Sequence, residues 1–378
     1  MNCEIFDLCG GCLSRDKEYE IYCREKFESF KKLIAPIINK NTKVNLPIFI
    51  PDGCRRRASF AFEYKKGKLS LGFNAALSHQ IVDTKKCLLL TPQLNNIFPF
   101  LRELLEAVCN EPYQIRKGKK ITDMFINKGD VFICETSNGT DVVLEYDAPL
   151  ELNHRMIIFE KVSANDSVIR ISHRKSAFGN VETIIEKSRP FIKIGDYDVY
   201  VPAGTFLQPS QEGQNTLGKL VSGYLKNVKG NIADLFCGVG TFSYILASKT
   251  KVKITAVDSS EQLLKGFLDS VNRNQITNIK IMNKNLFKYP LDENELKEFD
   301  AILFDPPRAG AKALCESIAK SSYKPEILVA VSCNPNTFVN DAKTLMSGGY
   351  DLKEITMVDQ FIYSNHSELV AFFTKKHM

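Results

Sequence analysis

Two residues that can take part in covalent or acid–base chemistry follow short apolar runs near the C-terminus. Asp305 ends one run, and Cys333 lies two residues beyond the run 327–331. Both runs are partly β-branched and precede turn residues, which is typical of buried parallel strands. Ligands bind at the carboxyl ends of such strands in an open α/β sheet. We therefore expect an acid and a possible nucleophile at one edge of one sheet.

Two earlier runs, 232–236 and 254–258, predict further strands of the same sheet. A glycine turn with Gly238 follows the first run, and Asp258 ends the second. In nucleotide-binding α/β folds such a turn lets the backbone approach a ligand, and the acid binds ribose hydroxyls. Ser243 stands where the dinucleotide fingerprint has its third glycine, which favours S-adenosylmethionine over a pyrophosphate ligand. The glycine turn by itself is equally typical of an ordinary strand–helix connection.

A cluster of cysteines lies at the N-terminus. Cys3, Cys9 and Cys12 fall within ten residues, and two glycines between the last two let the backbone wrap closely around a centre. Three thiolates need a fourth ligand, and Cys87 is the best candidate because its basic, turn-like surroundings favour a thiolate. The spacing favours a metal centre over a chance cluster of free cysteines, but it does not separate zinc from iron–sulfur.

The middle of the chain is basic. Residues 31–120 contain 17 Lys and Arg against 6 Asp and Glu, which suggests a segment that binds nucleic acid. Within it, alternating residues on both sides of Gly67 predict a β-hairpin, and a second basic run follows at 116–120. The aromatic residues of the hairpin are expected to face either a core or unstacked bases. The alternative to RNA binding is an exposed, charged hairpin that has no ligand. The residues predicted to contact RNA phosphates are Arg55, Arg56, Arg57, Lys65 and Lys66.

The 378 residues allow two or three domains, with the composition of an ordinary soluble protein. No apolar run is long enough to span a bilayer and no signal pattern is present, so we expect a cytoplasmic protein. Residues 18–34 predict a packing helix, and the runs 157–171 and 197–201 predict short strands. Helical periods alternate with apolar runs only after about residue 204, the pattern of a doubly wound α/β domain. The expected divisions are a cysteine segment with its helix at 1–39, a mainly β, basic RNA-binding domain at 40–203, and the α/β domain at 204–378.

Four motifs in the α/β domain, taken together, resemble the RNA (uracil-5)-methyltransferase family. They are the segments 234–240, 305–310, 332–335 and 366–368, and the resemblance continues upstream through 206–209 to the N-terminal cysteines. It implies a Rossmann-like methyltransferase domain that uses S-adenosylmethionine.

The resemblance also implies roles for individual residues. Cys333 would be the nucleophile that adds to the uracil ring, and Glu368 would be the general base. The residues implied to hold S-adenosylmethionine are Gln208, Phe236, Gly238, Asp258, Asn285 and Asp305. A 4Fe-4S cluster would be bound by Cys3, Cys9, Cys12 and Cys87.

A cysteine cluster without an added N-terminal barrel resembles the short branch of the family, which methylates a uridine of 23S ribosomal RNA. The short gap between Cys3 and Cys9 departs from that branch. Another 23S site or a transfer RNA is therefore an alternative substrate, and no membrane or obligate protein partner is expected. The rival functions are an RNA cytosine-5 methyltransferase, a redox enzyme, and a non-catalytic iron–sulfur RNA-binding protein. The last would be expected to lack the nucleophile, the base or the cofactor acid, and all three are present.

Overall fold

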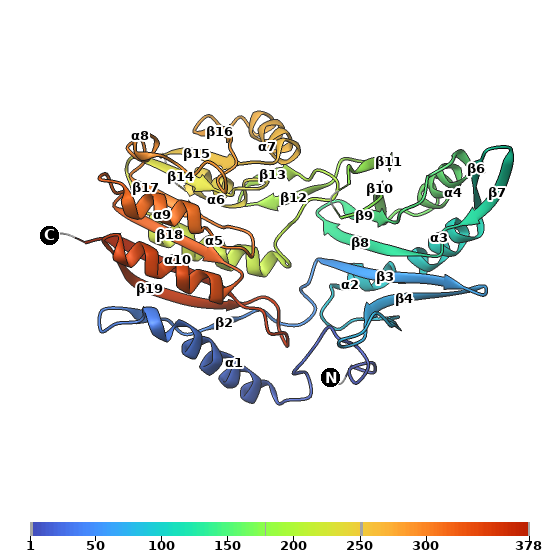
Figure 1. The fold of residues 1–378 in the computed structure, drawn as a ribbon, viewed down its shortest axis with the longest axis horizontal. Helices are drawn as coiled ribbons and strands as arrows, with labels where there is room; N and C mark the ends of the chain where they lie inside the picture. The colour runs from blue at the N-terminus through green and yellow to red at the C-terminus, as the bar shows by residue number, and fades with distance from the viewer. Residues whose placement is uncertain (1–2, 178, 250–251, 377–378) are drawn as a thin grey trace. The chain divides into compact units, whose positions relative to one another are not determined.

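The structure is a computed structural model that describes residues 3–177, 179–249 and 252–376 (Figure 1). The chain forms two compact units, each assembled from separate segments. Unit 1 consists of Met1–Asp16, Asp52–Ile192 and Val201–Ser210. Unit 2 consists of Lys17–Pro51, Lys193–Tyr200 and Gln211–Met378.

These units differ from the predicted ranges in two places. The N-terminal helix belongs to unit 2, because its residues Phe30 and Ile34 are buried in the core of that unit. The segment Val201–Ser210 belongs to unit 1, although the predicted boundary passes through it. Periodicity reveals which face of a helix is apolar, but it does not reveal which core covers that face.

Unit 2 is built on a nine-stranded sheet, counted over the described residues, in the order β1-β19-β20-β18-β17-β14-β15-β16, with β2 beside β19. The five strands from β18 to β16 are parallel, whereas β20 runs antiparallel to β18 and β19. All four strands predicted around the site are present. The bounds are β1 Lys43–Val44, β2 Ile48–Phe49, β14 Asn231–Leu235, β15 Lys253–Asp258, β16 Ile279–Asn283, β17 Ala301–Phe304, β18 Ile327–Ser332, β19 Tyr350–Asp359 and β20 Glu368–Lys375.

Helices cover both faces of this sheet, which confirms the doubly wound prediction. Alternate residues of β14 point to opposite faces: Ala233 and Leu235 join the core that contains α1, α9 and α10, whereas Asp234 meets Ser243 of α6. The bounds are α1 Tyr19–Ile34, the short 3-10 helix Ala35–Ile37, α5 Gln211–Leu225, α6 Thr241–Lys249, α7 Glu261–Arg273, α8 Glu293–Leu296, α9 Lys312–Lys320 and α10 Pro335–Ser347.

Unit 1 contains a seven-stranded sheet, again over the described residues, in the order β11-β10-β9-β8-β3-β4-β5. Its β3–β4 hairpin turns at Lys66 and Gly67, both with positive φ, so the predicted hairpin is confirmed. The hairpin residues Phe60 and Phe62 are buried in the core, not exposed to bases. The bounds are β3 Arg57–Lys65, β4 Lys68–Asn74, β5 Ile81–Asp83, β8 Lys128–Thr136, β9 Gly139–Glu145, β10 Val168–Arg174 and β11 Glu182–Glu186.

The same unit also contains helices that the sequence did not predict. Residues expected as a strand within 157–171 instead continue the helix α4, because His154, Ile158 and Val162 recur at helical spacing and are all buried. Strand structure begins only at Val168. The bounds are α2 Pro92–Asn96, α3 Phe98–Asn110 and α4 Leu152–Ser163, with the small sheet of β6 Pro112–Lys117 and β7 Lys120–Phe125. A further pair of strands, β12 Phe191–Ile194 and β13 Tyr197–Tyr200, falls mostly within the unit 2 segment Lys193–Tyr200. In the part of the chain that the structure describes, no helix is long and apolar enough to cross a membrane.

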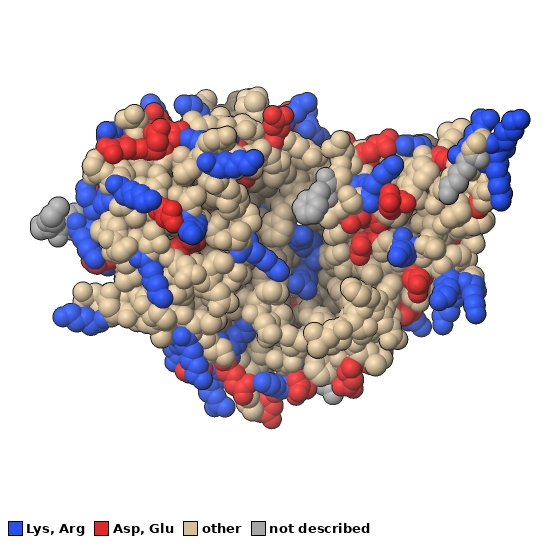
Figure 2. Space-filling view, in the orientation of Figure 1, with Lys and Arg blue, Asp and Glu red and all other residues tan. Residues whose placement is uncertain are grey.

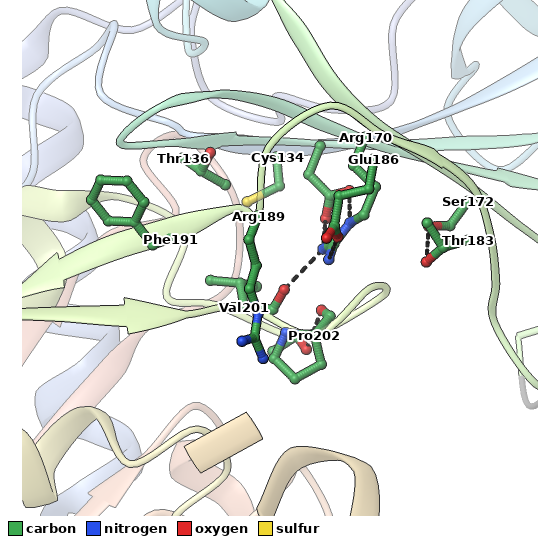
Figure 3. Close-up of polar contacts among 12 residues, drawn as sticks. Cys134, Thr136, Arg170, Ser172, Thr183, Glu186, Arg189, Phe191, Val201 and Pro202 are labelled. Carbon is green, nitrogen blue, oxygen red and sulfur yellow. Dashed lines mark hydrogen bonds and ion pairs between the residues drawn. The ribbon is translucent and has the colours of Figure 1, made fainter. Parts of the chain in front are cut away.

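A buried arginine fixes the start of the segment Val201–Ser210 within unit 1. The guanidinium of Arg170 pairs with Asp141 at 2.7 and 2.8 Å and with Glu186 at 3.3 Å. It also donates to the backbone carbonyl of Val201 at 2.9 Å, the contact drawn in Figure 3. Removing the Arg170 charge would leave the Asp141 carboxylate buried without this partner, a change that strongly destabilises a fold.

Candidate active site and cysteine pocket

The predicted strand ends lie at one edge of the unit 2 sheet. Leu235 is paired with Val257 on one side and with Phe304 on the other, and Phe304 is paired with Ala330. The next residues of β14, β15 and β17 are therefore Phe236, Asp258 and Asp305, which lie close to one level. Cys333 follows the last residue of β18. The four positions singled out in the sequence thus share the carboxyl edge of the sheet.

The glycine turn after β14 is built around the carboxylate of Asp258. The backbone N–H of Gly238 donates to Oδ2 at 3.0 Å, and the N–H of Ser260 donates to Oδ1 at 2.9 Å. A Cβ on Gly238 would meet no atom within 4 Å, so the turn faces open space. Each carboxylate oxygen keeps a lone pair, and the acid can still accept from ribose hydroxyls.

An aromatic pair lies beside this carboxylate. The ring centroids of Phe236 and Phe287 are 5.3 Å apart, and Phe287 is exposed. Asn285 holds Phe287 in place, because its side-chain oxygen accepts from the backbone N–H groups of Phe287 and Lys288 at 3.1 and 3.2 Å. An exposed ring of this kind can stack on a nucleobase. Phe287 was not predicted, although its position two residues after Asn285 was a usable signal.

Cys333 and Glu368 are brought together by the antiparallel pairing of β18 with β20. Ser332 is opposite Leu369, so the next pair along the ladder is Cys333 and Glu368. Glu368 is buried at 4% exposure, and Cys333 is half-buried. Asp305 completes the group, and its carboxylate interacts electrostatically with both side chains.

The three side chains of this group are shielded from water and two of them are acidic, so the pKa of each is raised. Burial, together with the charges of Glu368 and Asp305, raises the pKa of Cys333 to about 11. Burial also raises the pKa of Glu368 and, with the help of Glu368, that of Asp305. The thiol is therefore protonated at neutral pH in the free protein. Arg308 and the N-terminus of α10, which Asn334 caps, are the features that favour a thiolate.

Asp234 is a further buried acid under this edge. It is fully buried and accepts from the Ser243 hydroxyl at 2.6 Å. Burial raises its pKa to about 7, and its charge contributes to the raised pKa of Asp305. Ser243, which stands where a dinucleotide fingerprint has its third glycine, thus binds the Asp234 carboxylate.

In unit 1, the four predicted metal-binding cysteines line one pocket. Gly10 allows the N-terminal segment to approach closely, because a Cβ there would lie 2.9 Å from the carbonyl oxygen of Asn74. Two arginines, Arg15 and Arg55, also face the pocket. The pocket is lined by Cys3, Ile5, Phe6, Cys9, Gly11, Cys12, Arg15, Arg55, Phe73, Lys86, Cys87, Leu88 and Leu89.

The loop that carries Cys87 is held by one amide. The backbone N–H of Cys87 donates to the side chain of Asn95 at 2.8 Å, and that side chain donates back to the Cys87 carbonyl at 3.0 Å. Burial raises the pKa of Cys87 to about 11, so its basic, turn-like surroundings do not by themselves favour a thiolate as predicted. Among the described residues, no three His, Cys, Asp or Glu side chains are already arranged to hold a single metal ion.

The three arginines predicted to contact RNA make their contacts within unit 1. Arg56 is 5% exposed and its Nε donates to the carbonyl of Gln208 at 2.9 Å. Arg57 donates to the carbonyl of Leu207 at 2.9 Å and stacks on the Phe206 ring at 4.2 Å. Arg55 faces the cysteine pocket, and burial lowers its pKa. By contrast, the tip residues Lys65 and Lys66 are exposed.

These contacts show what the arginines do. They hold the backbone of the segment that carries Gln208, so their positive charge is used within the protein. Gln208 belongs to unit 1 and is 8% exposed, whereas the other residues predicted to bind the cofactor belong to unit 2. Clustered arginines in a sequence indicate that oxygen acceptors lie nearby. Here the acceptors are backbone carbonyls of the same chain.

The chain was compared with known proteins. The model of the tRNA (uracil-5-)-methyltransferase family matches residues 192–376. An uncharacterized RNA methyltransferase of Agrobacterium fabrum is 35% identical over 380 residues, which cover 98% of this chain and 83% of that protein. The chain belongs to the tRNA (uracil-5-)-methyltransferase family. The family resemblance recognised in the sequence is thereby confirmed.

Two further relatives of the family describe the range of similarity. The protein named 23S rRNA (uracil(1939)-C(5))-methyltransferase RlmD, from Aliivibrio salmonicida, is 26% identical over 379 residues, which cover 99% of this chain and 82% of that protein. The crystal structure of the Pyrococcus abyssi tRNA (uracil-54, C5)-methyltransferase with S-adenosyl-L-homocysteine matches with a TM-score of 0.73. That match has 22% identity and covers 97% of this chain and 86% of that one. It confirms the Rossmann-like methyltransferase fold.

Proposed function

We propose that this family member transfers a methyl group from S-adenosylmethionine to C5 of a uridine in 23S ribosomal RNA, in the cytoplasm. Its membership of the family makes it an RNA methyltransferase. The observation that carries the reaction type is the pairing of Cys333 with Glu368 at the carboxyl edge of the sheet. Methylation of a nitrogen or an oxygen would need no such thiol.

Each of the two residues has a defined role in the reaction. When the RNA binds, Cys333 loses its thiol proton to water and the thiolate sulfur bonds to C6 of uracil. The electron pair of the C5–C6 double bond moves onto the ring carbonyl as an enolate, whose C5 can take the methyl group. S-adenosylmethionine supplies that group from its sulfonium and leaves as S-adenosylhomocysteine. The Glu368 carboxylate then accepts the C5 proton, the electron pair restores the C5–C6 double bond, and the C6–S bond breaks to return the Cys333 thiolate.

S-adenosylmethionine is held by the residues predicted from the sequence. What supports this is the open glycine turn, the Asp258 carboxylate with its free lone pairs and the exposed Phe287 ring beside Phe236. The glycine turn allows close approach of the cofactor, the carboxylate can bind its ribose hydroxyls, and the ring can stack on its adenine. In unit 2 the set is Phe236, Gly238, Asp258, Asn285 and Asp305, to which we add Phe287, and Gln208 of unit 1 stays a prediction from the sequence.

Cys3, Cys9, Cys12 and Cys87 hold a 4Fe-4S cluster in this proposal. The support is that all four line one pocket, beside two arginines that can offset the negative charge of a thiolate-bound cluster. A 4Fe-4S cluster takes one thiolate at each of its four irons, and four cysteines line this pocket. The cluster would supply a link between the N-terminal segment and the Cys87 loop.

The choice of substrate is tested directly with the purified protein. Fragments that together cover 23S ribosomal RNA, and unmodified transfer RNA, are incubated with S-adenosylmethionine that carries a labelled methyl group. We expect label in a 23S fragment as 5-methyluridine, identified by mass spectrometry of nuclease digests. The support for 23S RNA is the relative from Aliivibrio salmonicida, and the name of the family model favours transfer RNA. Label only in transfer RNA would establish that second substrate instead.

RNA phosphates are contacted by exposed lysines of unit 1 and not by the arginines at 55–57, which face the interior of that unit. Lys65 and Lys66 occupy the tip of the β3–β4 hairpin. The β6–β7 hairpin carries a second exposed basic tip with Arg116, Lys119 and Lys120, where Figure 2 shows Lys and Arg side chains gathered at the upper right. Such a surface binds a polyanion through counterion release.

Replacing Lys65 and Lys66 together with alanine is expected to weaken RNA binding. The slope of log affinity against log salt should fall by roughly one unit for each lost phosphate contact. The measurement is a filter-binding titration at several salt concentrations. The matched control is the pair Lys226→Ala and Lys229→Ala, two exposed lysines of unit 2. An unchanged slope in the Lys65 and Lys66 variant would rule out the hairpin tip.

A further inference from the structure

The loop that leads into Glu368 is held from outside by the N-terminal helix. Residues 360–367 join β19 to β20, and Glu368 is the first residue of β20. Val358 and Glu368 are paired across the two strands. The position of Glu368 therefore depends on the base of this loop and on how the loop is fixed.

Lys26 of α1 makes four polar contacts, two of them to backbone carbonyls of this loop. Its Nζ lies 2.9 Å from Oδ1 of Asp359, and it donates to the carbonyls of Ser364 and His366, each at 2.7 Å. It also lies 3.1 Å from the hydroxyl of Tyr22, one helical turn earlier. The Lys26 and Asp359 side chains are 9% and 0% exposed, so this is a buried ion pair. All of these residues belong to unit 2.

Tyr22 completes the network at the other side of the loop. Its hydroxyl donates to Oδ2 of Asp359 at 2.5 Å and accepts from the backbone N–H of Tyr363 at 2.8 Å. Tyr363 has φ of 62°, a left-handed conformation that a bulky residue rarely adopts. A conformation of this kind persists only where surrounding contacts impose it. The Tyr22 contact is one that does so.

We propose that Lys26, with Tyr22, is a positioning residue for the general base. It holds loop 360–367 in the one conformation that places the Glu368 carboxylate beside Cys333. The inference rests on the proposed function, because it assumes that Glu368 removes the C5 proton. Lys26 itself touches neither the uracil nor the cofactor in this proposal.

A buried ammonium suits this task because of its geometry. Two backbone carbonyls and one carboxylate oxygen converge on a group that has three donors and no acceptor. Asp359 supplies the counter-charge that makes burial of the ammonium possible. A neutral side chain at residue 26 would leave both loop carbonyls without this donor.

The test separates the two halves of the reaction in the full-length protein. The substrate RNA carries tritium at C5 of uridine, so tritium release reports proton removal, and labelled methyl reports transfer. Lys26→Met should retain methyl transfer in a single turnover, while tritium release slows about tenfold or more, because small misplacements of a catalytic group cost this much. The methylated protein–RNA adduct should accumulate on a denaturing gel. Lys31→Met is the matched control on the exposed face of α1, where Lys31 pairs with Glu28, and it should behave as wild type.

Two further variants keep the inference falsifiable. Lys26→Met combined with Asp359→Asn removes both buried charges and tests the positioning role if the single variant does not fold. Tyr22→Phe keeps the ion pair and should slow tritium release by a smaller factor. If the folded Lys26 variant releases tritium at the wild-type rate, or loses methyl transfer and tritium release equally, the positioning role is overturned. Failure of the proposed function looks different, since Glu368→Gln would then form no adduct.

Discussion

Replacing Cys333 with alanine will abolish methyl transfer to RNA and leave the binding of S-adenosylmethionine almost unchanged. The variant lacks the sulfur that we propose activates C5, whereas the carboxylate of Asp258 and the ring of Phe236 remain in place. We expect a loss of at least about a thousandfold in rate, as is usual for removal of a nucleophile. Labelled methyl transfer and calorimetric cofactor binding measure the two properties. Cys54→Ala, which removes a half-buried thiol in unit 1, is the control.

The companion change Glu368→Gln should stop the reaction at a later point. The variant keeps the thiol but cannot accept the C5 proton, so a covalent methylated adduct should survive denaturing electrophoresis. In wild type, burial raises the pKa of Glu368, and the acid form cannot act as a base. Tritium release from C5 should therefore increase as pH rises through this raised pKa, and the increase should disappear in Glu368→Gln. Full methylation by Cys333→Ala, or an inactive Glu368→Gln without any adduct, would contradict these roles.

Replacing Cys87 with serine is expected to remove the proposed iron–sulfur cluster and much of the stability of the N-terminal segment. Wild-type protein purified without oxygen should be brown and contain about four irons per chain. The N-terminal segment has few buried apolar residues, so we expect the variant to be colourless, less soluble and sensitive to proteases within residues 3–16.

The control for this prediction is Cys134→Ser. Cys134 is also a cysteine of unit 1, but it does not line the pocket. Iron analysis, absorption spectra and limited proteolysis distinguish the two variants. A colourless wild-type protein with one zinc per chain would replace the cluster with a zinc site, and iron content unchanged by Cys87→Ser would exclude Cys87 as a ligand.

Local sequence patterns determined the strands and their ends in the α/β domain. The apolar runs before Phe236, Asp258, Asp305 and Cys333 could be recognised because a parallel strand buried on both faces needs a continuous apolar run. The carboxyl ends of such strands share one edge, so the candidate residues could be grouped before any coordinates were known. The hairpin turn at Gly67 was equally local, since it requires positive φ.

Tertiary structure alone decided which partners those elements meet. The arginines at 55–57 were recognisable as ligands for oxygen, but the chain supplied its own oxygens, the carbonyls of Leu207 and Gln208, about 150 residues away. The amphipathic pattern of α1 was visible, yet its contact with the loop before Glu368 spans more than 300 residues. Periodicity records the apolar face of one element, whereas these contacts depend on which distant backbone groups the fold brings within hydrogen-bonding distance.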